Sequence, residues 1–479
     1  MQKLIWILVI VIDGLRPDFV TPDRMPRLTA LGQRGIVFSA HHSVFPTVTR
    51  VNASSLVTGV YPEAHGLLGN TIYIPAVNAT RGLDTGSRAN LEAVASANGP
   101  LLTAPTLADL LQLAGKKLFA TGSGTSGAAL LLNPTIANGA IVHQEFTRPE
   151  SLAAHVLDVL GPAPPSAMPN AGQNRRAVDA FLKLGLDELQ PDVTLMWISD
   201  PDHTAHSKGL GTPETVNALK LADAEIGRIE DTLRAKGLLD RTNVIVTSDH
   251  GFSTHTGELK LNDLVAPFAT TLPDGSRDIV VAEGSINFRG AADPARVSAI
   301  VAALQKAPAV GAIFTRAARP GAIEGRVPGT LSFDVARWSH PRSGEILVSA
   351  NWSAEKNAQG IAGKTADSGV AGHGTSSPYD IHNTLIAAGP GFQQRAISDI
   401  PTGTADLAPT ILRLLGIDIP KTMTGRVLDE GLRNGSQERM PIERTTESVS
   451  NADGSYELTV QISSVAGHRY LDFTEVRRK

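Results

Sequence analysis

The chain has 479 residues, of which 42% are hydrophobic and 19% are charged, and its formal net charge at pH 7 is −4. This length and composition indicate a globular protein larger than one ordinary domain, and the slight acidity argues against duplex nucleic acid as a bulk partner. The sequence has no cysteine, so disulfide bonds, thiolate metal sites and a cysteine nucleophile are excluded.

The first predicted element is a buried strand. Residues 4–12 are continuously apolar and β-branched, a pattern typical of a central parallel strand that is covered on both faces. The run superficially resembles a signal peptide, but it is too short to span a membrane and has no small-residue cleavage site, so we expect no membrane span. It leads into Asp13 and Gly14, and open α/β sheets place their sites at the carboxyl ends of strands. An Asp-Gly pair is also a common turn, and the compartment stays open because a leader could precede this sequence.

A threonine begins a predicted helix further along. In residues 45–55, a turn-forming proline precedes Thr49, and small residues then lead into an apolar helical run. At a helix N-terminus, free backbone N–H groups and the helix dipole favour an alkoxide and an incoming anion, which suits a nucleophile. A lone threonine at such a place is usually only a helix cap. The following loop delivers Asn70, which could donate its amide to a developing oxyanion or simply occupy a turn.

Two further predicted strands also end in potential metal ligands. Residues 193–198 break into a segment in which Asp202 and His206 stand four positions apart, so one helical turn would place them on the same face. Aspartate and histidine suit zinc or a similar divalent ion, although such pairs also occur on solvated helices. Residues 243–247 form the second strand, which runs into an Asp-His-Gly sequence.

An aspartate follows the end of a predicted strand three times in this sequence. Asp13, Asp202 and Asp249 each follow a predicted strand, and two of them have a histidine beside them or one turn away. One aspartate at a strand end is ordinary, whereas three indicate a shared site. Six oxygen and nitrogen ligands with one hydroxyl suit two divalent ions, which in such sites lie on the order of 4 Å apart. The full predicted set is Asp13, Asp202, His206, Asp249, His250 and His373, together with the hydroxyl of Thr49.

The pattern changes after about residue 265. Residues 266–365 mix short strand-like runs with one helix, and we expect them to form an inserted α+β cap subdomain. Residues 1–265 and 366–435 would form a discontinuous catalytic core, an α/β three-layer sandwich around a central, mostly parallel sheet. Residues 436–479 form a C-terminal extension that is polar and then strand-like, and the sequence assigns it no chemistry.

The order of these motifs resembles the alkaline phosphatase superfamily and, within it, the nucleotide pyrophosphatase/phosphodiesterase branch. Thr49 stands at the nucleophile position of that branch, and Asn70 matches its oxyanion-binding asparagine. The resemblance covers residues 4–75, 193–265 and 370–430. The motif segments that carry it are residues 45–49, 56–66, 201–206, 247–251, 373–374 and 406–417.

The resemblance implies a two-metal phosphoric ester hydrolase with two Zn²⁺ ions, although other divalent ions are possible. Thr49 would attack phosphorus to form a covalent phospho-threonine, which water activated at the first zinc would release. Asn70 and the backbone N–H of Thr49 would stabilise the phosphoryl oxygens. The implied ligands are Asp202, His206 and His373 for the first zinc, and Asp13, Asp249, His250 and Thr49 for the second.

Two positions bear on the substrate. Arg50 stands where nucleotide-cleaving members of the branch have the aromatic residue that stacks on the base, and it could pair with a second substrate anion or be a solvated arm. Trp197 matches a position that is aromatic in the branch and could stack on a base or another flat group, although plain core packing is the commoner role. The expected partner is a small phosphorylated substrate, namely a phosphodiester, a nucleotide or a phosphonate, and the oligomeric state stays undetermined.

A phosphodiesterase is the first interpretation of these features. A phosphonoacetate hydrolase-like enzyme would use a similar threonine and similar metals but would need lysines over the substrate carboxylate, and a phosphomonoesterase is a further alternative. Sulfatase chemistry is disfavoured because no cysteine can become formylglycine, and a phosphoglycerate mutase-like enzyme would want serine in place of Thr49. A metal-stabilised binding protein without turnover is a remote alternative, against which the complete ligand set and the retained threonine argue.

Overall fold

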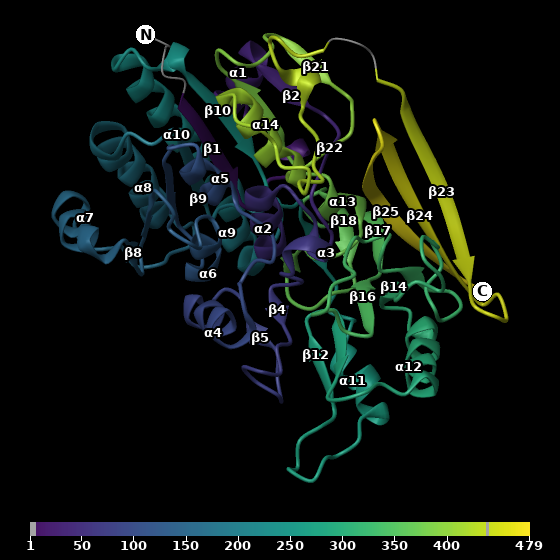
Figure 1. Cartoon of the computed structure of the whole chain (residues 1–479). Helices are drawn as coiled ribbons and strands as arrows, with labels where there is room; N and C mark the ends of the chain where they lie inside the picture. The colour runs from purple at the N-terminus through teal and green to yellow at the C-terminus, as the bar shows by residue number, and fades with distance from the viewer. Residues whose placement is uncertain (1–5, 437–439) are drawn as a thin grey trace.

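The computed structural model describes residues 6–436 and 440–479. Nine strands form its central sheet: β1 (Trp6–Ile12), β2 (Ile36–Phe38), β6 (Leu118–Gly122), β7 (Ala140–His143), β8 (Thr147–Arg148), β9 (Val193–Ile198), β10 (Thr242–Thr247), β20 (Leu385–Ala388) and β21 (Ala396–Ser398). Their order is β21-β2-β20-β10-β1-β9-β6-β7-β8 (Figure 1). The strands from β10 to β7 run parallel, whereas β20 and β8 are antiparallel to their neighbours. The prediction of a central, mostly parallel sheet is confirmed.

The central strand β1 is apolar along its whole length because both of its faces are covered. Successive side chains of a strand point to opposite faces, so alternate residues of β1 belong to two separate hydrophobic cores. The first core receives Ile7, Val9 and Val11, and the second receives Leu8, Ile10 and Ile12. The strand predicted over residues 4–12 is confirmed from Trp6 onward, and residues 4 and 5 lie outside the described residues.

Helices cover both faces of the sheet, so the core has three layers. One face packs against α2 (Thr49–Thr58), α5 (Leu107–Leu113), α6 (Ser126–Leu131) and α14 (Leu407–Leu415). The other face packs against α1 (Pro26–Arg34), α8 (Ala171–Asp179), the π-helix η3 (Ala180–Leu189) and α10 (Pro213–Ala235). In α10, the side chain of Thr212 caps the first turn, and apolar residues at helical spacing, such as Leu219 and Ile226, are buried against the sheet.

A second sheet lies apart from the central one, in the lower part of Figure 1. Its five strands are β12 (Ile279–Ala282), β13 (Ser285–Phe288), β16 (Ile346–Ala350), β14 (Val310–Thr315) and β15 (Leu331–Ser332), in that order. The helix α12 (Pro294–Lys306) buries Val297, Ile300 and Leu304. The strands and the helix expected between residues 266 and 365 are thus confirmed, while the boundaries of a cap subdomain stay a prediction.

A four-stranded sheet is built from strands that precede and follow the second sheet in the chain. Its order is β17 (Trp352–Lys356), β18 (Ala362–Thr365), β11 (Ser253–His255) and β19 (Ala371–Gly372). Residues 352–365, which the sequence placed in the cap, therefore join this sheet: β17 pairs with β18, and β18 pairs with β11, which follows closely after β10. The partner of a short polar strand is set by contacts distant in sequence, so the local pattern could not indicate it. The antiparallel pairing of Ser253 with Gly372 brings the segment after residue 372 to the end of β10.

The C-terminal extension is an antiparallel sheet of β23 (Ile442–Ser450), β24 (Tyr456–Val465) and β25 (His468–Arg478), drawn in yellow in Figure 1. It is attached to the core by side chains. The Tyr470 hydroxyl donates to Asp406 Oδ2 over 2.8 Å, and Trp352 Nε1 donates to the Thr474 carbonyl over 2.6 Å. The strand-like pattern near the C-terminus is therefore confirmed.

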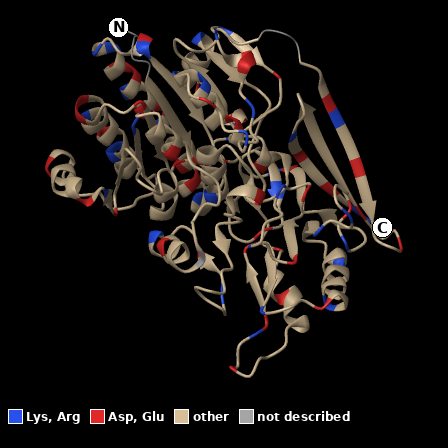
Figure 2. Ribbon diagram, viewed as in Figure 1, with Lys and Arg blue, Asp and Glu red and all other residues tan. Residues whose placement is uncertain are grey.

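Charged residues of both signs are interspersed over the helices, the loops and the C-terminal sheet (Figure 2), whereas the central strands β1, β6 and β9 have none. No helix in the described part of the chain has the length and the apolar character that crossing a membrane requires.

The remaining short elements are β3 (His41–His42), β22 (Thr402–Gly403), β4 (Thr71–Ile72), β5 (Leu83–Asp84), α3 (Pro62–His65), α4 (Arg88–Asn98), α7 (Ala153–Leu160), α9 (Asp202–Lys208), α11 (Leu261–Val265), α13 (Pro378–Ile381) and the 3₁₀ turns η1 (Pro17–Phe19), η2 (Glu150–Leu152), η4 (Leu239–Arg241), η5 (Ala266–Phe268), η6 (Thr404–Asp406) and η7 (Asp429–Gly431).

Candidate active site

Three aspartates meet at the carboxyl edge of the central sheet. β1 lies between β10 and β9 and is parallel to both, so the segments that follow these strands leave the sheet at the same edge. Asp13 follows β1, Asp249 follows β10, and Asp202 is the first residue of α9, which follows β9. The Asp202 N–H donates to the Asp13 carbonyl over 3.1 Å, and the Gly14 N–H donates to Asp249 Oδ1 over 3.2 Å. The structure therefore brings the three predicted carboxylates together.

The first ligand group consists of Asp202, His206 and His373. The Nε2 atoms of the two histidines lie 3.2 Å and 3.3 Å from Asp202 Oδ1. Each ring also donates its Nδ1–H to a backbone carbonyl, His206 to Ala371 over 3.0 Å and His373 to Thr47 over 2.8 Å. These hydrogen bonds fix the tautomer, so both Nε2 lone pairs face the carboxylate.

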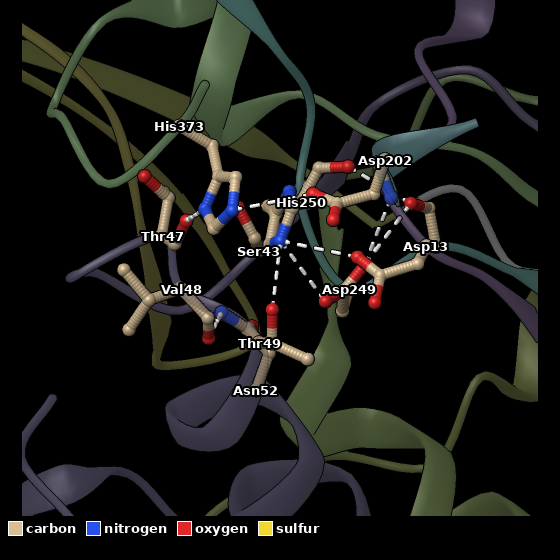
Figure 3. A network of polar contacts seen from close by, with 12 residues as sticks. Asp13, Ser43, Thr47, Val48, Thr49, Asn52, Asp202, Asp249, His250 and His373 are labelled. Carbon is tan, nitrogen blue, oxygen red and sulfur yellow. Dashed lines mark hydrogen bonds and ion pairs between the residues drawn. The ribbon is translucent and has the colours of Figure 1, made fainter. Parts of the chain in front are cut away.

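The second ligand group consists of Asp13, Asp249 and His250, with Thr49 beside it. His250 Nε2 lies 3.0 Å from Asp249 Oδ2 and 3.4 Å from Asp13 Oδ1. The same nitrogen lies 3.4 Å from Thr49 Oγ1, as Figure 3 shows. The His250 Nδ1–H donates to the Gly251 carbonyl over 2.9 Å, which again leaves Nε2 as a lone-pair donor.

The two ligand groups form one centre. The rings of His250 and His373 are stacked, with their centroids 3.4 Å apart and an interplanar angle of 13° (Figure 3). Each group can be satisfied by its own ion, and the contact between the rings holds the two positions side by side.

The residues of both groups fit divalent cations. Within the described residues, four buried carboxylate oxygens have no hydrogen-bond partner, and three of them belong to these groups: Asp13 Oδ1, Asp202 Oδ1 and Asp249 Oδ2. Each is the oxygen that faces a histidine Nε2, and two buried lone pairs that face each other are costly unless a cation lies between them. Around a tetrahedral zinc with ligands at about 2.0 Å, neighbouring ligand atoms are about 3.3 Å apart. The separations of 3.0, 3.2, 3.3 and 3.4 Å match this geometry.

The pKa shifts of Asp13 and His373 also suit metal ions. Burial, followed by the charges of Asp202 and Asp249, raises the pKa of Asp13, because three carboxylates share a space without solvent. Burial, followed by His250, lowers the pKa of His373 to about 4, so its imidazole is neutral at pH 7, as a metal ligand must be. A divalent cation would relieve the repulsion among the carboxylates.

A third cluster, formed by His42, His382 and Asp472, has a different geometry. His42 Nε2 and Asp472 Oδ1 are 2.8 Å apart, and the His42 Nδ1–H donates to the Thr402 carbonyl over 2.9 Å. Asp472 Oδ2 accepts from the Ser463 hydroxyl over 2.8 Å. A separation of 2.8 Å is that of a direct charge-assisted hydrogen bond and is shorter than the distance of about 3.3 Å between zinc ligands. We interpret the cluster as a buried ion pair that joins β25 to β3, just before the loop that carries Thr49.

Thr49 is the first residue of α2, but it does not cap the helix. Val48 occupies the cap position, and the Thr49 hydroxyl faces His250 instead. The preceding loop is held by Asn52, whose side chain accepts from the Val44 N–H over 2.7 Å and donates to the carbonyls of Val44 and Val48. The Thr49 backbone N–H has no hydrogen-bond partner among the described residues, so it remains available to an anion.

Asn70 lies beside the start of α2. Its Oδ1 accepts from the Arg50 backbone N–H over 3.1 Å, and its Nδ2 has no partner among the residues that the structure describes. The Arg50 guanidinium is only 12% exposed; its Nε donates to Thr85 Oγ1 over 3.4 Å, and one terminal nitrogen lies 3.9 Å from Asp84 Oδ1. Arg50 is therefore engaged by its own neighbours and is not a solvated arm.

Trp197 does not occupy the place that the stacking interpretation requires. Its side chain is 2% exposed, and its indole N–H donates to Asp13 Oδ2 over 2.8 Å. The proposed stacking on a substrate is therefore wrong, because the ring lies within the sheet behind a ligand. Sequence reasoning missed this orienting role, and it also missed Asn52. The signal available for Asn52 was an amide side chain among the apolar and small residues that follow Thr49.

A cavity of about 550 Å³ opens beside the centre. His373 and Thr375 line one wall, and Glu283 and Val348 from the second sheet line another. Lys260 also lines this cavity. Its size is within the range of about 300–1,000 Å³ that is usual for small-molecule sites.

Two solved structures of known proteins share this fold. A mutant of the alkaline phosphatase PafA has a similar structure, with a TM-score of 0.67 at 16% identity over 90% of this chain and 99% of that chain. The murine ectonucleotide pyrophosphatase/phosphodiesterase 5, solved in an inactive form in complex with AMP, is similar with a TM-score of 0.59 at 18% identity over 87% of this chain and 96% of that chain. At these identities, the two structures establish the shared fold.

The chain belongs to the type I phosphodiesterase/nucleotide pyrophosphatase family, whose family model matches residues 7–369. Among curated proteins, a venom phosphodiesterase from Macrovipera lebetinus is 26% identical over 247 residues, which are 50% of this chain and 24% of the relative. The chain thus matches about a quarter of the length of this relative.

Proposed function

We propose that the protein is a divalent-metal-dependent phosphodiesterase that acts on small phosphorylated substrates through a covalent phospho-threonine at Thr49. The observation that carries this proposal is the position of the Thr49 hydroxyl, 3.4 Å from His250 Nε2 at the first residue of α2. The family to which the chain belongs supports a phosphodiester substrate, and the AMP complex of murine ectonucleotide pyrophosphatase/phosphodiesterase 5 supports a nucleotide-like one.

The two ligand groups would each hold one ion. Zinc fits best, because aspartate oxygens and neutral histidine nitrogens at tetrahedral spacing are its usual ligands. When bound, such ions lower the pKa of an alcohol and neutralise charge on the phosphoryl oxygens. The first ion would be held by Asp202, His206 and His373, and the second by Asp13, Asp249 and His250 beside the Thr49 oxygen.

Thr49 carries the covalent step of the proposed reaction. Its Oγ forms a bond to phosphorus while the bond to the leaving oxygen breaks, and the leaving group departs as an alcohol after it takes up a proton. Water then attacks the same phosphorus, the bond to Thr49 Oγ breaks, and the hydroxyl regains its proton. The unpaired N–H of Thr49 and the Nδ2 amide of Asn70 would donate to the phosphoryl oxygens, where charge gathers in each transition state.

The cavity beside His373 would take one organic substituent of the diester. Its walls combine apolar side chains such as Val281 and Val348 with polar ones, which suits a nucleoside. A phosphonoacetate-type substrate is the second candidate, because Lys260 lines the same cavity and could pair with a substrate carboxylate.

A substrate panel tests this proposal. We expect hydrolysis of bis-p-nitrophenyl phosphate and of the p-nitrophenyl ester of thymidine monophosphate, slower hydrolysis of p-nitrophenyl phosphate, and loss of all activity with a chelator. Release of phosphate from phosphonoacetate in place of diester hydrolysis would favour the second candidate. Activity on neither class would contradict both.

A variant of the nucleophile tests the intermediate. We expect Thr49→Ala to reduce turnover by several orders of magnitude while the protein keeps its bound metal, measured by elemental analysis. Thr49→Ser, which keeps a hydroxyl, should retain measurable turnover. A fully active Thr49→Ala variant would exclude Thr49 as the nucleophile.

A further inference from the structure

The backbone around Asn70 is held from two sides. Its carbonyl accepts from the Thr85 N–H over 2.9 Å and from the Thr85 hydroxyl over 2.7 Å. On the opposite side, its N–H donates to Glu283 Oε2 over 2.6 Å, and the next N–H, that of Thr71, donates to the same oxygen over 3.2 Å. Glu283 thus supplies one charged acceptor for two successive backbone donors, and hydrogen bonds to an ionised acceptor are the stronger kind.

Glu283 reaches this loop from another part of the chain. It lies in the turn between β12 and β13 of the second sheet, and its φ of 57° is in the left-handed region that residues with a side chain rarely adopt. The loop makes room for it, because a Cβ at Gly69 would lie 2.7 Å from Glu283 Oε2. An unfavourable backbone conformation and a close approach that needs glycine both serve the same contact.

The contact acts on the part of Asn70 that matters for chemistry. The Oδ1 of its side chain accepts from the N–H of Arg50, the residue after the nucleophile. The other end of the side chain is attached to the backbone of Asn70. The direction in which the Nδ2 amide points therefore depends on where that backbone lies. The carboxylate of Glu283 holds the N–H side of that backbone, while Thr85 holds its carbonyl. Burial lowers the pKa of Arg50, and the negative charges of Glu283 and Asp84 oppose this shift.

We propose that Glu283 is a positioning residue: its carboxylate holds the backbone of Asn70 and Thr71, so that the Asn70 amide stays aimed at the phosphoryl group. The inference rests on the proposed function, because the donor role of Asn70 is part of that function. It also couples the second sheet to the reaction centre, since a shift of the β12–β13 turn would move Asn70.

Steady-state kinetics with the diester substrate test this role. We expect Glu283→Ala to lower kcat about 10- to 100-fold, the range found when residues that orient a functional group are removed, with little change in KM. Glu283→Gln keeps a neutral acceptor and should recover most of the rate. Combined with Asn70→Ala, Glu283→Ala should cost nothing further, because a residue that acts through another is silent once the other is gone. A wild-type rate for Glu283→Ala, or a full additional loss in the Asn70→Ala background, would overturn the inference.

A matched control is Glu324→Ala. Glu324 is an exposed glutamate between β14 and β15 of the same sheet, and among the described residues its side chain makes no hydrogen bond or ion pair. The control should keep the wild-type rate and metal content.

Hydrogen exchange separates this inference from the proposed function. In Glu283→Ala, the amides of Asn70 and Thr71 should exchange faster by mass spectrometry, while Glu283→Gln and Glu324→Ala should match the wild type. This readout does not depend on turnover. Unchanged exchange in Glu283→Ala would therefore overturn the positioning role even if the wild type is active, and an inactive wild type would contradict the proposed function alone.

Discussion

Replacement of Trp197 by phenylalanine should weaken the ligand group that contains Asp13. The indole N–H donates to Asp13 Oδ2 over 2.8 Å, while Oδ1 of the same carboxylate faces His250. Phenylalanine keeps most of the buried ring but removes the donor. The carboxylate then loses the bond that orients it toward the ion.

The size of the effect follows from this one hydrogen bond. A bond to a charged group contributes about 1.5–3 kcal/mol, which is about 10- to 100-fold in affinity at about 1.4 kcal/mol per tenfold. The hydrogen bond to Trp197 also lowers the pKa of Asp13, against burial and the neighbouring carboxylates, which raise it. Its loss therefore lets a proton compete more strongly with the metal, and the defect should grow as the pH falls.

Competition with a chromophoric chelator measures the affinity of each ion. We expect the affinity for one ion to fall and that for the other to stay unchanged, because the indole N–H of Trp197 donates to Asp13, which belongs to the second ligand group. The control is Trp338→Phe: Trp338 is equally buried, and its indole N–H donates to the Leu68 carbonyl over 2.9 Å, so this variant loses a comparable bond without touching a ligand. Equal affinities in Trp197→Phe and wild type would refute the orienting role.

Three further predictions concern the ligands and two buried groups. Asp249→Asn should reduce the metal content from two ions per chain to one, measured by elemental analysis, and a content of two would contradict the ligand assignment. Burial, followed by His340 and Arg342, lowers the pKa of His65 from 6.5 to about 3, so the unfolded chain binds a proton that the folded chain does not, and stability falls as the pH drops through that window. Urea unfolding of His65→Gln between pH 7 and 4 should show a shallower fall than wild type, by at most about 1.4 kcal/mol per pH unit, and parallel curves would contradict this. Asp472→Asn leaves His42 without its carboxylate and should destabilise the fold by about 3–5 kcal/mol in urea unfolding, whereas an unchanged midpoint would mean that the pair contributes little.

Local patterns in the sequence were sufficient to predict several of the candidate metal ligands. The apolar run that ends at Asp13 and the four-residue spacing of Asp202 and His206 depend only on strand burial and helix geometry. The rule that parallel strands end at one edge then brings Asp13 and Asp202 together. Each of these inferences uses a pattern that can be recognised within a short segment of the sequence.

The remaining features depend on which distant segments touch. Tryptophan is common both in hydrophobic cores and in sites that stack on a substrate, so the sequence alone could not assign Trp197 to either. Its N–H donates to Asp13 because Asp13 directly follows the strand that neighbours the strand of Trp197 in the folded sheet. The backbone conformation of Glu283 is unfavourable by itself, so no local preference predicts it. The pairing of β18 with β11 and of β17 with β18 likewise depends on register across the chain.

The two ligand groups become complete at different times during synthesis. Asp13, Asp249 and His250 have all been synthesised once residue 250 is added, whereas the group of Asp202 and His206 is complete only after the addition of His373, which follows the second sheet. Translation proceeds at about 5–20 residues per second, and N-terminal segments fold first. The nascent polypeptide would thus capture one cation early and the other only when translation nears its end.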